Sequence, residues 1–337
     1  MTSHCTDGLP GGSSTQQQCS RADRIDGVGK LKPYLQGLPA MNAPATLTEY
    51  GQTIDANAMV VPTDTDHFEL EADHPGLGDA AYIARRQELF TLTRKHRIEK
   101  LGPPIIEYTD EETRIWREVS PKLDELHRKH ASEIYLKAKQ TLAIGSDTIP
   151  QLRTLSDRVQ RETKMHLVPA EGALPYRTFY ESIAERGFPV TQFLRHGSHP
   201  EFTPEPDMIH DCLGHVPPLM NQDYAELLTL IGKAAATTPH GDQVLALKRF
   251  SWFSIEFGLI EEHGETKVFG AGILSSFGEI PHSLSSPHAT RRPFVTEQVI
   301  RTDYDPSKMQ VDFFIAPSFA FLRSELEALV QKMGIGV

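Results

Sequence analysis

Apolar residues recur three and four positions apart over much of the chain beyond residue 79, and this is the spacing of amphipathic helices. A broad apolar face with basic residues between its members predicts a helix over 79–97. A second pattern, introduced by Thr109 and several acidic residues, predicts one or two helices over 109–142. Two more helices are predicted, one after Pro150 and one over 318–333.

The segments between these helices are less regular. Residues 205–235 predict two helices separated by Pro217 and Pro218. An almost continuous apolar run over 250–262 predicts a buried segment, and the glycine-containing residues 266–279 include strand-like pieces. The predicted fold class is therefore mainly α with small β elements.

The domain organisation follows from where this periodicity begins. Residues 1–61 are rich in glycine, serine, glutamine, proline and alanine and show no sustained period, which predicts a flexible N-terminal arm. Residues 62–337 are expected to form a single domain, because a unit of this size buries enough surface to fold without disulfide bonds.

Composition narrows the classes of partner. The formal net charge of −11 argues against nucleic acid or an anionic membrane surface, because both require basic patches. The three cysteines have no framework spacing, which indicates a reducing compartment. The N-terminus has no apolar signal region, and no apolar stretch approaches the roughly 20 residues that span a bilayer. A cytoplasmic location is therefore expected.

The strongest chemical signal is the pair His210 and His215. Residues five apart diverge on an ideal α-helix, so the two imidazoles can converge only if the helix changes between them. Gly214 and Pro217 are candidates for ending it. A histidine pair can also simply cap a helix end, so the pair needs a third ligand to indicate a metal site.

Glu256 supplies that candidate ligand. It is the only charged residue between Phe250 and Ile260, and a buried carboxylate is costly unless it is paired or binds a metal. Two imidazoles and one carboxylate form the facial triad of non-haem Fe(II) oxygenases, which leaves coordination positions open. The sequence therefore predicts a metal site made by His210, His215 and Glu256.

Other chemistries use similar residues. A zinc hydrolase could use the same three ligands, with Asp211 or Glu279 as general base. The triad could also be a structural metal site in a binding protein. A separate pattern, His240-Gly241-Asp242 with a distal His282 or His288 and Arg291, is that of a 2-oxoglutarate dioxygenase, but it follows a turn-like segment.

Several separated strings in this chain resemble the aromatic amino acid hydroxylases. They are LEADHPGLGDAAYIARR, DTIPQL, LRHGSHPEFTPEPDMIHDCLGHVP, WFSIEFGL and FGAGILSSFGE, and the resemblance covers about residues 66–325. It implies a single catalytic domain of that family that hydroxylates the ring of a free aromatic amino acid. It also implies the use of Fe(II), O2 and a tetrahydropterin such as tetrahydrobiopterin.

The resemblance carries over residue by residue. His210, His215 and Glu256 match the iron ligands, and Glu279 matches a catalytic glutamate near pterin and iron. The matches to the substrate site are Arg195 for the carboxylate, Asp207 to orient it, Thr203 and Ser275 as hydrogen-bond donors, and Pro206 and Trp252 along the ring. The matches to the pterin site are Gly172, Ala173, Leu174 and Phe179.

Departures from the family refine these expectations. Asp211, Ser251 and Pro189 stand where animal members carry glutamate, tyrosine and histidine. The regulatory domain and tetramerisation tail of the animal enzymes have no counterpart, so a bacterial-type catalytic domain and a monomer are expected. Trp252 and the string from Ser275 to Glu279 favour conversion of phenylalanine to tyrosine. Tryptophan 5-hydroxylation and phenylalanine 3-hydroxylation are the alternatives within the family.

Overall fold

The computed structural model describes residues 46–49, 52–55, 70, 72, 74–201, 203–306 and 308–337. Residues 41–337 belong to one compact unit. Within the predicted arm, only two strands are described, β1 (Thr46–Glu49) and β2 (Gln52–Asp55), which pair in antiparallel fashion. The rest of the arm lies outside the described residues, and its boundary at residue 61 stays a prediction.

Most of the long helices occur where the apolar periodicity predicts them, although those over 176–184 and 241–251 were not predicted. Thr109 begins one of them with a capping box, in which its side chain and that of Glu112 each bind the other residue's backbone N–H. Asp79 and Ser318 also cap their helices through side-chain oxygens. The long helices are α1 (Ala80–Ile98), α2 (Asp110–His130), α3 (Glu133–Leu142), α4 (Leu152–Thr163), α5 (Tyr176–Ala184), α7 (Gln222–Thr237), α8 (Gly241–Ser251) and α12 (Phe319–Lys332).

Short helical turns connect these elements and carry most of the candidate site. They are α6 (Met208–His210), η1 (Asp211–His215), η2 (Pro217–Met220), η3 (Trp252–Glu256), α9 (Ala271–Leu274), α10 (Glu279–Ser285) and α11 (Thr296–Val299). Of these, η2 is a 3₁₀-helix, as expected where two prolines interrupt the chain, whereas η1 and η3 are π-helices.

Two small sheets complete the main body. In the first, β3 (His166–Ala170) and β4 (Gly187–Thr191) run parallel. In the second, the strand order is β6 (Glu265–Val268), β5 (Gly258–Glu262), β8 (Asp312–Ala316) and β7 (Thr290–Pro293). The predicted class, mainly α with small β elements in a single domain, is confirmed. The strand-like pieces predicted over 266–279 reduce to β6, since α9 and the start of α10 follow it.

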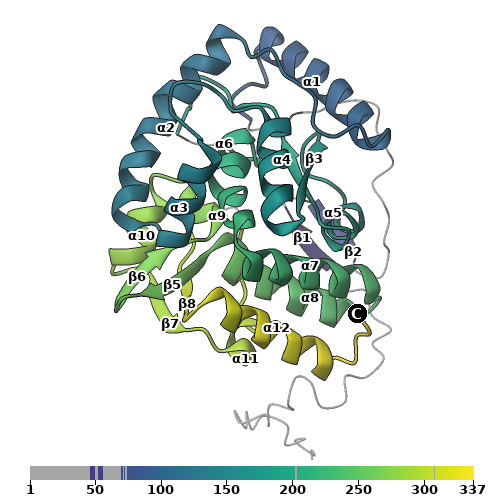
Figure 1. Cartoon of the computed structure of the whole chain (residues 1–337), viewed down its shortest axis with the longest axis vertical. Coiled ribbons are helices and arrows are strands. Elements are labelled where there is room, and N and C mark those ends of the chain that lie inside the picture. The colour runs from purple at the N-terminus through teal and green to yellow at the C-terminus, as the bar shows by residue number, and fades with distance from the viewer. Residues whose placement is uncertain are drawn as a thin grey trace, which may run out of the picture. The chain divides into compact units, whose positions relative to one another are not determined.

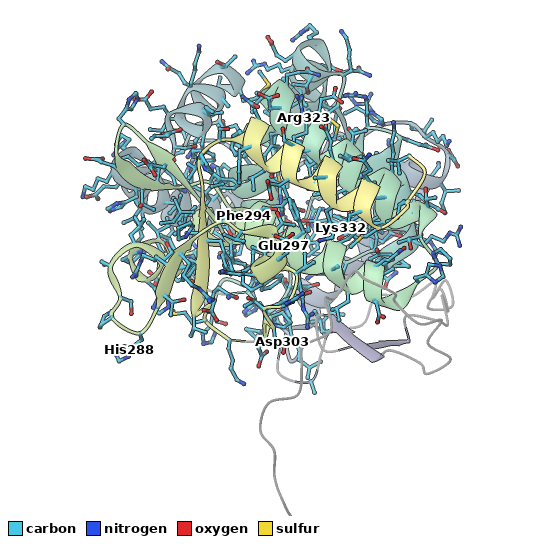
Figure 2. The ribbon with its side chains drawn as sticks, turned by 90° about the horizontal axis from the view of Figure 1, so that it is seen from below. His288, Phe294, Glu297, Asp303, Arg323 and Lys332 are labelled. Atoms are coloured by element: carbon cyan, nitrogen blue, oxygen red, sulfur yellow. The ribbon has the colours of Figure 1, made fainter. Side chains whose placement is uncertain are left out.

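Helix α7 occupies the centre of the helical layer. It packs against α5 on one side and α12 on the other (Figure 1). Most of its large apolar side chains are buried. The four-stranded sheet lies beside this layer, below α2 and α3 in the same view. Helix α12 lies on the outside, where Lys332 approaches Glu297 of α11 to 3.4 Å (Figure 2).

No helix in the part of the chain that the structure describes has both the length and the apolar character needed to cross a membrane.

Candidate metal centre

Three side chains from two distant segments converge on one point. The Nε2 atoms of His210 and His215 lie 3.1 Å apart, and Glu256 places its oxygens 3.7 Å and 3.2 Å from them. Their ligand atoms all lie within 4.8 Å of one another, which no other group of three such residues does among the described residues. Two imidazoles and one carboxylate at this separation can hold one metal ion and leave coordination positions free.

The local backbone explains how histidines five residues apart can meet. Gly214 and Pro217 led us to expect that the helix ends between the two histidines, but it does not. It continues from α6 as the π-helix η1, where Val216 N donates to Asp211 O over 3.0 Å. A π-helix closes its hydrogen bonds five residues apart, so positions i and i+5 lie along one face. The predicted convergence occurs, and the predicted cause was wrong.

The third ligand sits at the end of a second π-turn. In η3, Phe257 N donates to Trp252 O over 2.8 Å, and Glu256 is the last residue of the turn. The Glu256 side chain is only partly buried, at 21% exposure, because it faces the metal position rather than the core. Both ligand-bearing segments therefore use the same rare backbone device, which is frequent at functional sites.

Gly214 serves close packing rather than helix termination. A Cβ atom at this position would lie 2.8 Å from the carbonyl oxygen of Ala271 and 2.9 Å from its Cβ. The absence of a side chain lets η1 lie directly against α9.

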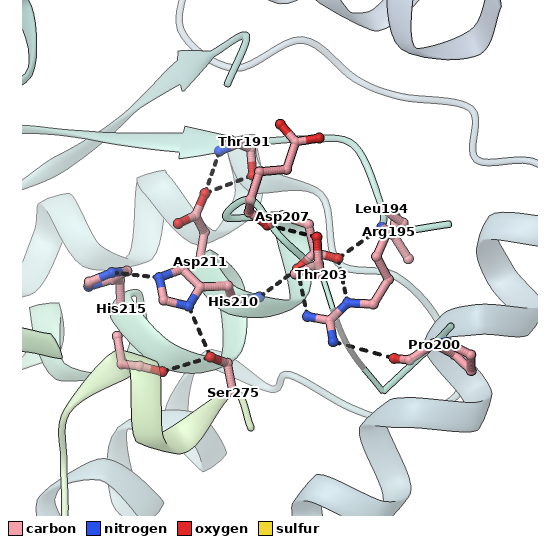
Figure 3. Close-up of polar contacts among 12 residues, drawn as sticks. Thr191, Leu194, Arg195, Pro200, Thr203, Asp207, His210, Asp211, His215 and Ser275 are labelled. Carbon is pink, nitrogen blue, oxygen red and sulfur yellow. Dashed lines mark hydrogen bonds and ion pairs between the residues drawn. The ribbon is translucent and has the colours of Figure 1, made fainter. Parts of the chain in front are cut away.

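Hydrogen bonds join η1 to β4. Asp211 accepts them from the backbone N and the Oγ1 of Thr191, at 2.7 and 2.8 Å (Figure 3).

Ser275 fixes the orientation of His210. Its hydroxyl donates to Ala271 O over 2.8 Å, so it accepts from His210 Nδ1 at 2.9 Å (Figure 3). The Nδ1–H tautomer that results leaves the Nε2 lone pair pointing at the metal position. Many metal sites fix their histidines in this way, through a hydrogen bond from the ring nitrogen that does not bind the metal. Burial and the nearby His215 lower the pKa of His210 to about 4, so this imidazole is neutral and ready to bind a metal.

His215 Nε2 and Glu256 Oε1 lie 3.2 Å apart, which is within ion-pair distance. Burial opposes ionisation of both groups, but their mutual attraction is stronger. As a result the pKa of His215 is raised and that of Glu256 is lowered. The Nδ1 atom of His215 is buried and makes no hydrogen bond with the described residues. A divalent cation at this position would supply the attraction that Glu256 otherwise receives from His215.

A buried guanidinium lies next to the metal-binding cluster. Arg195 is 3% exposed and binds Asp207 through both Nε and Nη2, at 2.9 and 2.8 Å. Asp207 also accepts from His210 N at 3.0 Å, so one carboxylate ties the guanidinium to the first metal ligand (Figure 3). Burial disfavours the ionised form of Asp207, but the attraction of the Arg195 guanidinium is stronger. The pKa of Asp207 therefore lies below its usual value.

Arg195 retains donors for a further anion. Besides the two bonds to Asp207, Nη1 donates to Pro200 O at 3.3 Å, so three of the five guanidinium N–H groups are used. The nearby Thr203 donates to Glu205 O at 2.8 Å, and Pro206 is half-buried immediately before Asp207. The structure thus brings Arg195 and Asp207 together as expected.

The residues predicted to hold a pterin lie around α5. The ring of Phe179 meets that of Phe188 edge to face, with 6.2 Å between the ring centroids. The centroid of the Phe188 ring lies 5.0 Å from that of His215, so a row of rings leads from α5 to the metal ligands. Gly172 and Leu174 are half-buried and Ala173 is exposed, in the loop between β3 and α5.

Glu279 begins α10 with an unusual carboxyl group. One oxygen accepts from Gln310 N at 2.9 Å, while Oε2 is buried and makes no hydrogen bond with the described residues. Burial raises the pKa of Glu279 to about 7, and the bond from Gln310 only partly offsets this. Such a group can exchange a proton or a hydrogen bond with a bound molecule near neutral pH.

Trp252 lies in a cluster of rings. Its ring stacks on that of Tyr304, with 4.2 Å between the ring centroids and 12° between the ring planes. The centroid of the Phe257 ring lies 4.7 Å from that of Trp252. Its indole Nε1–H donates to Gln310 Oε1 over 2.9 Å. Sequence patterns did not indicate Tyr304 or Gln310, because neither lies in a string that carries the family resemblance.

The alternative dioxygenase pattern is not assembled. His240 only precedes α8, His282 binds the backbone oxygen of Gln310 at 2.8 Å, and the Arg291 guanidinium binds backbone oxygens of residues 282–289. The side chains of His282 and Arg291 therefore have structural partners, and the pattern does not form a second metal-binding group among the described residues.

The fold and the cluster define a helical domain with one two-histidine, one-carboxylate metal-binding site beside a buried guanidinium. Residues 52–335 match the model of the biopterin-dependent aromatic amino acid hydroxylases, and the chain belongs to this family. It is therefore a pterin-dependent aromatic amino acid monooxygenase.

Two relatives illustrate the match in sequence. The chloroplastic phenylalanine 4-monooxygenase of Pinus taeda is 38% identical over 269 residues, which is 79% of this chain and 75% of that protein. The tyrosine 3-monooxygenase of Bos taurus is 36% identical over 79% of this chain, which spans only 54% of the bovine protein.

Two solved structures illustrate the match in fold. Phenylalanine hydroxylase from Legionella pneumophila has a TM-score of 0.66 and 30% identity, over 69% of this chain and 93% of that one. Phenylalanine hydroxylase from Chromobacterium violaceum, with bound iron(III) and oxidised 7,8-dihydrobiopterin, has a TM-score of 0.64 and 27% identity, over 72% and 92%.

Proposed function

We propose that this enzyme uses Fe(II), O2 and a tetrahydropterin to hydroxylate L-phenylalanine to tyrosine. The observation that carries the proposal is the convergence of His210, His215 and Glu256 at the edge of a site that also contains Arg195. The phenylalanine monooxygenases among the relatives and solved structures support the choice of substrate.

The donor set of the cluster fits iron. His210, His215 and Glu256 would hold the ion through two neutral imidazoles and one carboxylate, and the remaining positions would be open. Iron, together with the pterin, supplies the reduction of O2 that makes an oxygen atom available to the ring. Ser275 would keep His210 in the required tautomer, and this is the role that its present hydrogen bonds support.

The amino acid would bind through its carboxylate. Arg195 has two N–H groups left after its bonds to Asp207 and Pro200, and a guanidinium grips a carboxylate with two parallel bonds. Asp207 holds that guanidinium in place and is itself bonded to His210 N, so the substrate would be placed in fixed relation to the metal. Thr203 and Pro206 line the same loop and would complete this end of the site.

The pterin would lie on the α5 side. Gly172, Ala173 and Leu174 offer backbone groups for its polar edge, and Phe179 offers a ring on which it can stack. Glu279 would meet it with its free Oε2, either as a hydrogen-bond acceptor or, when protonated, as a donor.

The ring of the substrate would pack against Trp252. A large indole wall leaves less space for a second indole, so phenylalanine is favoured over tryptophan. Tryptophan 5-hydroxylation and phenylalanine 3-hydroxylation change only the ring or the position attacked, and zinc-dependent hydrolysis would need neither pterin nor O2.

Product identification tests the proposal. Metal-free protein is loaded with Fe(II) or Zn(II) and incubated with phenylalanine, tyrosine or tryptophan, with and without tetrahydrobiopterin, and the products are separated by mass and retention time. We expect para-tyrosine from phenylalanine only with Fe(II) and pterin. Formation of meta-tyrosine, a preference for tryptophan, or turnover without pterin would contradict it.

We also propose that the enzyme is a cytoplasmic monomer. The support for a reducing compartment is the odd number of cysteines, of which Cys212 is free and buried. Light scattering during gel filtration measures the oligomeric state, and fractionation of the source cells measures the location.

A further inference from the structure

Gln310 stands out as a buried polar residue at the meeting point of several site elements. It lies between α11 and β8, is 4% exposed, and uses all of its polar groups. Its Oε1 accepts from Trp252 Nε1 at 2.9 Å and its Nε2 donates to Asp312 O at 3.0 Å. Its backbone N donates to Glu279 Oε1 at 2.9 Å and its backbone O accepts from His282 Nε2 at 2.8 Å.

These contacts constrain the Trp252 indole in complementary ways. Tyr304 and Phe257 contact the ring system and fix its plane, but the ring can still slide between its neighbours as the side-chain torsions change. The hydrogen bond from Nε1 opposes this remaining movement. Because Gln310 Nε2 is held by Asp312 O, the amide cannot turn its oxygen away from the indole.

The backbone of the same residue is fixed by α10. Glu279 and His282 lie one turn apart on that helix, and they bind the N–H and the carbonyl of Gln310 respectively. One residue therefore links the ring wall at Trp252 to the carboxyl group at Glu279, through a side chain on one side and the backbone on the other.

We infer that Gln310 is a positioning residue for ring selectivity, which holds the Trp252 indole at the angle that admits a phenyl ring and rejects an indole. The inference rests on the proposed function, in which Trp252 lines the substrate's ring pocket. Gln310 does not touch the reacting atoms. Through Trp252 it would also keep the ring at the correct distance from the metal, so that pterin oxidation yields hydroxylated product.

The central variant is Gln310→Leu, which keeps the approximate volume and the backbone bonds but leaves Trp252 Nε1 without its acceptor. Loss of a buried hydrogen-bond partner should reduce the preference for phenylalanine over tryptophan by about tenfold in kcat/KM. The tyrosine formed per pterin oxidised should fall as well. Gln310→Asn, which is shorter by one methylene, is a milder second variant with the same expected direction.

A double-mutant cycle separates positioning from general loss of stability. In Trp252→Phe the ring has no N–H donor, so adding Gln310→Leu should change selectivity no further. The matched control is Gln243→Leu on α8. Gln243 is also buried, accepts from the Thr238 hydroxyl and donates to Met333 O at 3.0 Å, but it has no contact with Trp252. It should lower stability and leave selectivity unchanged.

A second readout needs neither metal nor pterin. The chain has two tryptophans, so the fluorescence of Trp252→Phe isolates the share of Trp116, and the difference from wild type reports Trp252. Gln310→Leu should show faster local depolarisation and stronger acrylamide quenching of the Trp252 component, whereas Gln243→Leu should match wild type.

The outcomes are distinct. Wild type that forms no tyrosine overturns the proposed function, and the fluorescence comparison still decides whether Gln310 immobilises Trp252. Unchanged selectivity and unchanged Trp252 depolarisation in Gln310→Leu and Gln310→Asn overturn the inference. So does an equal loss of selectivity when Gln310→Leu is introduced into Trp252→Phe.

Discussion

Individual side chains of this site act through a few hydrogen bonds that fix charge and direction. Asp207 binds both Arg195 and His210 N, and Ser275 holds His210 from behind. The metal ligands could be predicted from the sequence, because imidazoles and a lone carboxylate in an apolar run carry a strong signal. The bonds that orient them could not, since they join residues far apart in the chain whose meeting depends on packing.

Substitution of Arg195 by lysine tests the carboxylate site. Lysine keeps the charge but cannot bind Asp207 at two points while it presents two parallel donors. The KM for phenylalanine should rise roughly tenfold or more, with the iron content unchanged. Steady-state kinetics and metal analysis measure both quantities. Arg153→Lys, whose guanidinium binds the Pro103 carbonyl, is the control, and an unchanged KM in Arg195→Lys would place the carboxylate elsewhere.

Glu279 should make stability depend on pH. Its folded-state pKa of about 7 lies above the value of 4.5 for an unperturbed glutamate, because burial disfavours the carboxylate. Below about pH 4.5 the carboxyl group is neutral in both the folded and the unfolded state, so it imposes no cost on folding. Stability is then lost as pH rises through 7, because the folded state must ionise a buried group.

The variant Glu279→Gln keeps the acceptor for Gln310 N and removes this titration. Its advantage over wild type in the free energy of unfolding should grow from near zero at pH 4.5 to on the order of 3 kcal/mol above pH 7. Urea unfolding of the metal-free proteins across this range measures it. The exposed Glu261→Gln should show no such trend. A constant difference for Glu279→Gln would contradict the raised pKa.

At the level of elements, two π-turns create the site. The long helices were predictable because caps and apolar periodicity are local features, as at Thr109 and Asp79. The π-turns at 211–215 and 252–256 were not, because an α-helix and a π-helix share the same residue preferences. What selects the wider turn is packing, seen where Gly214 lets η1 approach the backbone of Ala271.

Gly214→Ala tests this packing. The new Cβ would lie 2.8 Å from Ala271 O, so α9 must move, and α9 leads into Ser275, which holds His210. We expect a loss of about 1–3 kcal/mol in unfolding free energy together with weaker Fe(II) binding. Thermal unfolding and metal titration measure the two effects. Gly145→Ala has open space around its Cβ and should change neither. If Gly214→Ala binds iron normally, the packing of α9 against η1 does not set the ligand geometry.

At the scale of the whole molecule, segments far apart in the chain meet at the metal-binding cluster. The class and the single catalytic domain followed from the sequence. The strand order β6-β5-β8-β7 did not, because it joins strands separated by α9, α10 and α11. The division at residue 61 stays a prediction. Strands β1 and β2 lie before it, and the family match begins at residue 52.

Truncation locates the boundary of the domain. Because the composition of residues 1–61 lacks the apolar periodicity of a packed core, residues 62–337 alone should keep the midpoint of thermal unfolding and the kcat/KM of the full chain. Residues 41–337 serve as the comparison. If the shorter chain loses activity or several degrees of stability and the longer one does not, residues 41–61 belong to the catalytic domain.

The most direct test of the metal assignment is the Fe(II) content and tyrosine formation of Glu256→Gln. The amide has the shape of the carboxylate but not its charge, and it would leave two neutral imidazoles as the only protein ligands of full strength. We expect iron affinity to fall by at least about tenfold and tyrosine formation to be lost, while the fold shown by circular dichroism is kept. A variant that retains one iron per chain and hydroxylates phenylalanine at the wild-type rate would contradict it.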